Sequence, residues 1–163
     1  MKCMTCGKGE LKVSRENHRY TESGLSNVTL LGVEVRRCPK CGDVEVAIPR
    51  IAQLHRAIAF VLAGQRAKLT GAEVRFLRKY LGRSGADFAA MIGVTPETVS
   101  RWENDREPMG ATAERLLRLM VVRDKPIDEY PNERLAEVAQ EKAERGRFEF
   151  AVGKSGWHAE AAA

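Results

Sequence analysis

The sequence lacks any long apolar run. Its longest uninterrupted apolar stretch, from Ala57 to Ala63, is far shorter than the roughly 20 residues that a membrane-spanning helix needs. The N-terminal segment is polar from Lys2 onward, so it has no apolar region of the kind that directs secretion. We therefore expect a cytoplasmic protein with no membrane association.

A catalytic set and a strong charge imbalance are missing as well. No Ser/His/Asp combination or carboxylate pair is apparent, which argues against an enzyme.

The net charge is only +5; residues 1–125 carry +8 (22 basic and 14 acidic side chains) and residues 126–163 carry −3. A basic body with an acidic tail suits an anionic partner such as DNA.

Cysteine is scarce, but its four copies are regularly placed. They form two Cys-x-x-Cys pairs, each followed directly by glycine, and they are Cys3, Cys6, Cys38 and Cys41. In a reducing compartment such pairs favour a tetrahedral four-thiolate Zn²⁺ site over two disulfides. An iron–sulfur centre such as that of rubredoxin has the same spacing and stays open as an alternative. Four protein thiolates leave no open position for substrate, so the metal is expected to be structural.

The residues around the cysteine pairs predict a small antiparallel sheet. Residues 12–22, 28–36 and 44–48 are rich in alternating and β-branched residues and indicate three short strands. A sheet this small has too little core to be stable without the metal. We therefore predict a zinc-binding β domain over residues 1–49.

The rest of the chain has mainly helical patterns. Residues 50–69 indicate an amphipathic helix with a basic hinge at 64–69, and residues 70–125 indicate an all-α bundle that serves DNA binding and dimerisation. Residues 126–163 form an acidic tail in which 132–145 could be a solvated helix and 148–152 a short strand, whereas the end from Gly153 is expected to be disordered. The predicted fold is thus a small zinc-bound antiparallel β domain followed by an all-α helix-turn-helix bundle.

The helix-turn-helix is predicted from residues 85–104. Ala89 provides the small residue needed where two helices cross, and Gly93 suits the tight turn between them. On a helical wheel, Val99 and Trp102 face inward, which leaves the opposite side of the second helix free to read DNA. The candidate DNA-contacting residues in and around this pair of helices are Ser84, Thr95, Glu97, Thr98, Ser100, Arg101 and Arg106.

The last helix of the bundle, residues 111–122, has more apolar surface than one packing face needs. We therefore expect it to form a homodimer contact. The candidate residues for this contact are Leu116, Leu117 and Met120.

Taken together, the two Cys-x-x-Cys-Gly motifs and the run Val99–Asn104 resemble the MqsA/YgiT family of antitoxins, whose C-terminal half is of the phage-repressor (Xre, Cro/C1-type) class. Residues 48–56 and Leu69–Lys79 resemble this family too, and the resemblance covers residues 1–122. Gly85 departs from the repressor class, which often has a DNA-contacting glutamine there. Glu97 is a second departure, because it places an acid where a neutral base-reading residue is expected.

The resemblance implies a two-domain dimer. Its zinc domain would bind and neutralise an mRNA-cleaving toxin, and its helical domain would repress its own operon at a palindromic double-stranded DNA operator. It assigns zinc ligation to the four cysteines and base reading to Arg101. A stand-alone zinc-finger regulator without a toxin would use the same residues and is the alternative.

Overall fold

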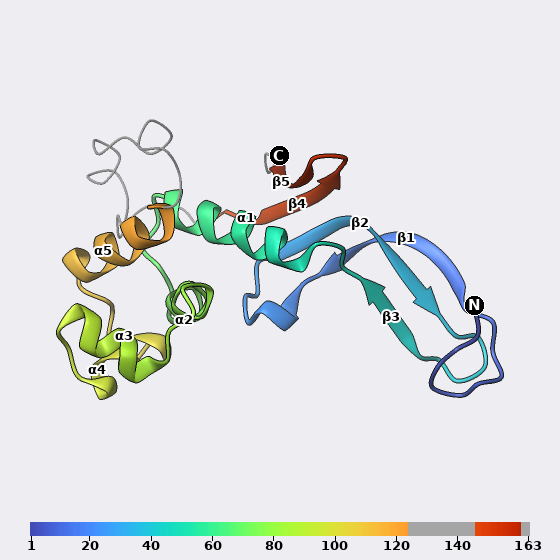
Figure 1. The fold of residues 1–163 in the computed structure, drawn as a ribbon, viewed down its shortest axis with the longest axis horizontal. Coiled ribbons are helices and arrows are strands. Elements are labelled where there is room, and N and C mark those ends of the chain that lie inside the picture. Colours follow the sequence, from blue (N-terminus) through green and yellow to red (C-terminus); the bar gives the residue numbers. More distant parts are fainter. Residues whose placement is uncertain (124–145, 161–163) are drawn as a thin grey trace. The chain divides into compact units, whose positions relative to one another are not determined.

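A computed structural model describes residues 1–123 and 146–160, which belong to two compact units (Figure 1). The first unit comprises Met1–Tyr20, Ser26–Leu54 and Arg147–Ala163. The second comprises Thr21–Leu25, which includes the 3₁₀ turn η1 (Thr21–Ser23), and His55–Gly146. The predicted tail helix at 132–145 lies outside the described residues.

The first unit contains the predicted antiparallel sheet. Strand β2 (Val28–Arg37) lies in the centre and pairs antiparallel with β1 (Lys12–Arg19) and β3 (Val44–Ala47). Alternate β2 residues are buried, including Val33 and Val35, as expected for a strand with one face against a core. The N-terminal β sheet is therefore confirmed.

A C-terminal hairpin extends this sheet. Strand β4 (Phe148–Gly153) runs parallel to the first half of β2, and β5 (Gly156–Glu160) pairs antiparallel with β4. Phe150 is completely buried, and the Trp157 indole N–H donates to the carbonyl of Pro49 at 2.7 Å. The expectation of disorder from Gly153 was wrong for residues 153–160, because this hairpin buries aromatic side chains and pairs its backbone with the sheet.

The partner of β2 changes halfway along the strand. Residues 28–31 pair with β4 and residues 34–37 pair with β3, which leaves Gly32 and Val33 opposite neither strand. Gly32 has φ of +59°, and its N–H donates to the Asn17 side chain at 3.1 Å, where the register with β1 also shifts. This bulge separates the part of β2 that pairs with β4 from the part that pairs with β3, and we call this place, at Gly32 and Val33, the seam of the sheet.

Five α-helices follow within the described residues. They are α1 (Ile51–Gly64), α2 (Gly71–Tyr80), α3 (Gly85–Ile92), α4 (Pro96–Glu103) and α5 (Ala111–Val122). Three of them begin at side-chain caps, because the hydroxyls of Thr70, Ser84 and Thr95 each accept the backbone N–H three residues later. Each hydroxyl satisfies a backbone N–H that has no partner within its own helix.

The division between the units falls inside α1, between Leu54 and His55. The expected hinge at residues 64–69 therefore lies in the second unit. There the fully buried Arg118 of α5 pairs with Glu114 at 2.7 Å, and Glu114 also accepts the N–H of Leu69. Arg118 further donates to four backbone carbonyls at the end of α1 and just after it, those of Leu62, Ala63, Gln65 and Ala67.

Candidate metal centre and nucleic-acid interface

The four cysteine sulfurs lie together at one end of the sheet. The Sγ atoms of Cys3 and Cys41 are 3.7 Å apart, as are those of Cys6 and Cys38, and all four lie within 4.8 Å of one another. A tetrahedral site with Zn–S bonds of about 2.3 Å has sulfur–sulfur edges of about 3.8 Å. The four cysteines could therefore hold a metal ion.

The backbone of both cysteine pairs is folded to aim the sulfurs inward. The N–H of Gly7 donates to the Cys3 carbonyl at 2.9 Å, and the N–H of Gly42 donates to the Cys38 carbonyl at 3.0 Å. Both glycines have positive φ, +65° and +76°, a conformation in which a side chain would be strained. The glycine after each cysteine pair is thus required by the turn.

Two further features suit a thiolate–metal site. The backbone N–H groups of Lys8 and Gly9 donate to Cys6 and lower its pKa to about 6, which favours the thiolate that a metal needs. At Cys41 the backbone of Asp43 also lowers the pKa, but hydrogen bonds with the other cysteine sulfurs and burial raise it to about 12. Gly9 also approaches the site so closely that a Cβ there would lie 2.3 Å from the Cys38 sulfur. A residue with a side chain at position 9 would therefore displace the Cys38 sulfur from the other three.

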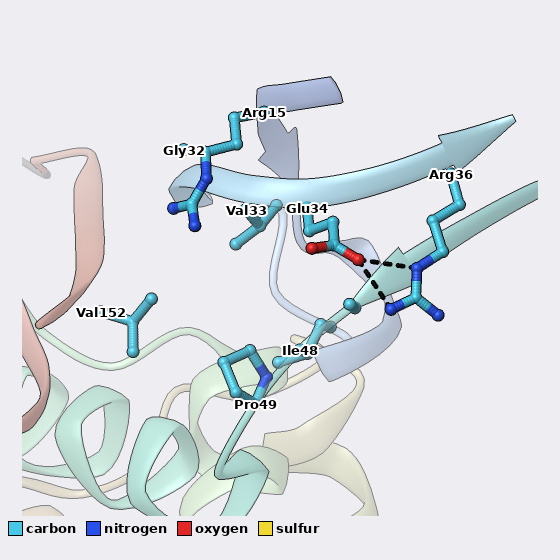
Figure 2. A pocket seen from close by; sticks show the side chains of 9 residues that line it. Arg15, Gly32, Val33, Glu34, Arg36, Ile48, Pro49 and Val152 are labelled. Atoms are coloured by element: carbon cyan, nitrogen blue, oxygen red, sulfur yellow. Dashed lines mark hydrogen bonds and ion pairs between the residues drawn. The ribbon is translucent and has the colours of Figure 1, made fainter. Parts of the chain in front are cut away.

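A groove of about 450 Å³ lies at the seam of the sheet (Figure 2). Its apolar lining comes mainly from Val33, Ile48 and Val152. Arg15 projects over the groove, and no polar group among the described residues contacts its guanidinium. The carboxylate of Glu34, opposite Arg15 in register, is paired instead with Arg36 at 2.7 Å, so Arg15 keeps an unpaired charge beside an apolar surface.

In the second unit, α3 and α4 are joined by a three-residue turn at residues 93–95, where Gly93 has φ of +76° as the sequence predicts. Val99 and Trp102 are buried, and Ala89 is buried where the helices meet. The opposite side of α4 is open; its exposed candidates are Glu97, Ser100 and Arg101, with Thr98 half-buried at the edge. The exposed face of α4 is therefore the one predicted from the helical wheel.

Glu97 and Arg101 lie four residues apart on α4, a spacing that favours an ion pair within a helix, but the structure does not pair them with each other. Arg101 pairs with Glu107, in the loop after α4, at 2.9 Å, and also donates to the Thr98 hydroxyl at 3.0 Å. The carboxyl of Glu97 has a lowered pKa chiefly because a backbone N–H at the start of α4 and the Thr95 hydroxyl donate to it. Glu97 thus accepts hydrogen bonds at the helix N-terminus, and Arg101 pairs with Glu107 instead.

The other candidate DNA contacts have different local roles. The Ser84 and Thr95 hydroxyls cap α3 and α4, accepting the N–H groups of Asp87 and Thr98 at 3.0 and 3.2 Å. Arg106 is exposed, and its backbone N–H donates to the Arg101 carbonyl. Thr95 directly precedes α4 and Arg106 follows it by three residues, whereas Ser84 directly precedes α3.

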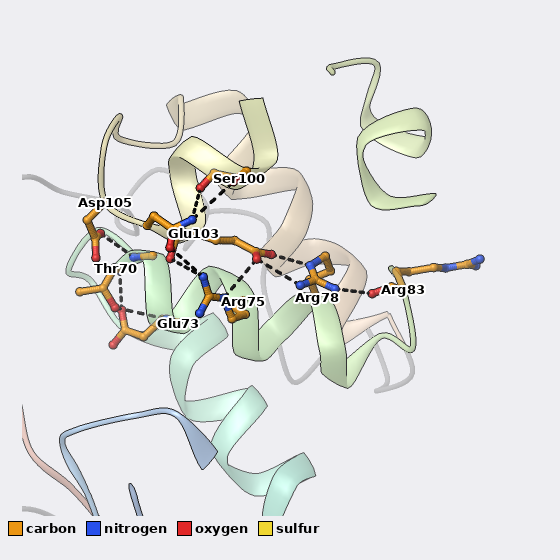
Figure 3. Close-up of polar contacts among 10 residues, drawn as sticks. Thr70, Glu73, Arg75, Arg78, Arg83, Ser100, Glu103 and Asp105 are labelled. Atoms are coloured by element: carbon orange, nitrogen blue, oxygen red, sulfur yellow. Dashed lines mark hydrogen bonds and ion pairs between the residues drawn. The ribbon is translucent and has the colours of Figure 1, made fainter. Parts of the chain in front are cut away.

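Sequence reasoning missed the residue that fixes α4 in place. Glu103 at the end of α4 pairs with Arg78 and with Arg75 of α2, and its side chain is only 8% exposed (Figure 3). The start of α2 also contacts the residues that follow α4, because the N–H of Gly71 donates to the Asp105 carboxylate at 2.7 Å. Two arginines three residues apart share one helix face, which is the signal that could have indicated a shared acidic partner.

The predicted dimer contact on α5 is wrong at one residue, Leu117. Leu117 is completely buried within its own chain and so has no surface to offer a second copy. Leu116 is 41% exposed and Met120 is half-buried, and the equally exposed Leu119 lies beside them. The apolar composition of α5 indicated a surplus of apolar surface but could not separate its inward face from its outward face.

Comparison with known families gives one match. Residues 1–130 match a family model described as the antitoxin component of a bacterial toxin–antitoxin system, MqsA. No curated protein matches the chain. Within residues 1–123 and 146–160, no helix is both long and apolar enough to cross a membrane.

Proposed function

Because the chain belongs to the MqsA family of antitoxins, we propose that it is the antitoxin of a type II toxin–antitoxin system that neutralises a ribonuclease toxin and represses its own operon. The observation that carries the proposal is the family match, whose span of residues 1–130 includes both the cysteine cluster and all five helices. A toxin partner follows from the family. The proposal adds that the toxin cleaves mRNA, and that the chain acts by binding and not by catalysis.

We assign zinc to the cysteine cluster. Four soft sulfur ligands that lie within 4.8 Å of one another, with two pairs 3.7 Å apart, suit tetrahedral Zn²⁺, whereas hard cations such as Ca²⁺ and Mg²⁺ prefer oxygen ligands. The ion would hold the two cysteine turns against each other and thereby fix the end of the sheet. Its role is structural.

The toxin is proposed to dock on the sheet of the first unit. The groove at the seam supports this, because it combines the apolar Val33 and Val152 with the unpaired charge of Arg15. A toxin segment with an acidic residue beside an aliphatic one would fit both features. Arg15→Glu should therefore prevent neutralisation, whereas Lys12→Glu, on the same strand but outside the groove, should not.

Operator DNA is proposed to bind the open face of α4. Arg101 can fork to the O6 and N7 atoms of guanine, and its exposed pair with Glu107 is weak enough to be exchanged for that contact. Arg101→Ala should cost about 1–3 kcal/mol of binding and relax the preference at one base pair per half-site. Glu107→Gln frees Arg101 and should not weaken binding. Uniform weakening across all sequences would assign Arg101 to phosphate contact alone.

Dimerisation is proposed to use the exposed stripe of α5, formed by Leu116, Leu119 and Met120. Two copies would then place two α4 helices on one side of the duplex. Half-sites about 10 base pairs apart, or a multiple of that, are expected in the palindromic operator.

The decisive experiment uses the full chain, because β4 and β5 complete the sheet from the far end of the sequence. The wild type, Arg101→Ala and Arg15→Glu are each co-expressed with the product of the adjacent reading frame, and growth and operator binding are measured. We expect Arg101→Ala to protect cells without repressing, and Arg15→Glu to repress without protecting. If no neighbouring product is toxic, or if the wild type gives no protection, the antitoxin proposal fails and a stand-alone regulator remains.

A further inference from the structure

A second cavity, of about 430 Å³, lies in the first unit near the start of β2 and β4. The described residues that line it are all polar; two of them are arginines and none is acidic. They are Arg19, Ser26, Asn27, Thr29 and Arg147. This composition differs from that of the groove at the seam, whose lining is largely apolar.

One of the two arginines is fixed in place by backbone. The Nε and Nη2 atoms of Arg19 donate to the carbonyl oxygen of Ser26 at 3.2 and 2.9 Å. A carbonyl orients the guanidinium but brings no negative charge to neutralise it. Arg19 is therefore held at the cavity with its charge uncompensated by this contact.

The other arginine is brought there by the C-terminal hairpin. Arg147 directly precedes β4, and the next residue, Phe148, donates its N–H to the Asn27 carbonyl at 3.0 Å and lies opposite Val28 in register. In the described part of the chain, the Arg147 side chain makes no hydrogen bond or ion pair. Arg147 also lies beyond residue 130, where the family match ends.

The nearest acid in register does not belong to the cavity. Glu149 lies opposite Thr29, yet it is not among the lining residues and forms no ion pair with Arg19 or Arg147. Among the described residues, two guanidinium groups thus share one polar cavity without a carboxylate. Guanidinium forks match phosphate oxygens, and a phosphomonoester carries close to two negative charges at neutral pH.

We propose that this cavity binds a phosphate dianion, either inorganic phosphate or the terminal phosphomonoester of a nucleotide. The two arginines supply two positive charges for it, and the Ser26, Asn27 and Thr29 lining is polar enough to face the anion. An internal phosphodiester of a nucleic acid has one charge and two blocked oxygens, so it binds the same site more weakly. The site depends on the C-terminal hairpin, which supplies Arg147.

The test is calorimetric titration of the full metal-loaded chain at fixed ionic strength. The probes are inorganic phosphate, a nucleoside 5′-monophosphate and dimethyl phosphate, a diester. We expect inorganic phosphate and the monoester to bind at one site per chain and to compete with each other, and the diester to bind at least about tenfold more weakly. Failure of inorganic phosphate to bind, or equal affinity for the diester, would overturn the proposal.

Two variants and a matched control locate the site. Arg147→Gln and Arg19→Gln should each weaken phosphate binding about tenfold or more, since each removes hydrogen bonds between charged groups. Lys154→Gln removes the same charge from the exposed turn of the hairpin and should leave the affinity unchanged. Circular dichroism confirms that each variant is folded. An Arg147→Gln variant that binds like the wild type, or a Lys154→Gln variant that loses as much affinity, contradicts the assignment.

Discussion

Replacing Glu103 with Gln should destabilise the helical unit far more than its position at a helix end suggests. The Glu103 side chain is 8% exposed, and its partners Arg78 and Arg75 are 11% and 43% exposed. Removing one partner of a fully buried pair costs about 3–5 kcal/mol, whereas an exposed pair contributes about 0–1 kcal/mol. The pair with Arg78 is close to a fully buried pair, and the pair with Arg75 is close to an exposed one. Because Gln can keep one hydrogen bond, we expect a loss of about 2–3 kcal/mol.

The assay is thermal unfolding followed by circular dichroism at the helical band. A loss of this size should lower the melting temperature of a unit this small by roughly 8–24 °C. Glu107→Gln is the matched control, because its pair with Arg101 is about half exposed on both sides, 49% and 48%, and should contribute less than about 1 kcal/mol. Equal losses in the two variants would refute the argument that Glu103 fixes α4 against α2.

Three further changes test other parts of the structure. Cys38→Ser should abolish metal binding and unfold the sheet while leaving the helical signal, and emission spectroscopy of the wild type should find one zinc per chain; iron, or no metal, would contradict the zinc assignment. Leu119→Glu should give monomers of unchanged stability in sedimentation, whereas Leu117→Ala should lower the stability by about 2–5 kcal/mol; a dimeric Leu119→Glu variant would place the contact elsewhere. Gly71→Ala should destabilise the protein by about 1–3 kcal/mol, because the added Cβ would lie 2.6 Å from the Trp102 carbonyl oxygen. Gly85→Ala is also at the first position of a helix, but its Cβ would meet nothing within 4 Å, so it should be neutral or stabilising. A larger loss of stability in Gly85→Ala than in Gly71→Ala would be inconsistent with the close packing of α2 on α4.

Local signals made much of the fold predictable. The hydroxyl caps at Thr70, Ser84 and Thr95 define three helix starts, and the paired cysteines with their glycines define the metal cluster. Each of these features depends on residues within about four positions of one another or on a spacing that chemistry requires. Such features can be predicted from the sequence without knowing the tertiary contacts.

The features that were missed depend on distant partners. The strand β5 has no alternating pattern, and its place in the sheet depends on β4 pairing with β2, more than 100 residues away in the sequence. Arg101 selects Glu107 over the favourably spaced Glu97 because the start of α4 already engages Glu97. Leu117 and Leu119 look equivalent in sequence, and only packing against the rest of the unit shows that the first is buried and the second exposed.

The most direct test of the proposed function measures RNA cleavage by the purified product of the adjacent reading frame, with and without this chain. We expect the metal-loaded wild type and Arg101→Ala to block cleavage at one chain per toxin. Chelated protein should lose this inhibition, because the sheet depends on its metal, yet still bind operator DNA through its helices. If the metal-loaded chain leaves cleavage unchanged, or if the chelated chain inhibits as fully as the metal-loaded one, the metal-bound sheet is not the part that neutralises the toxin.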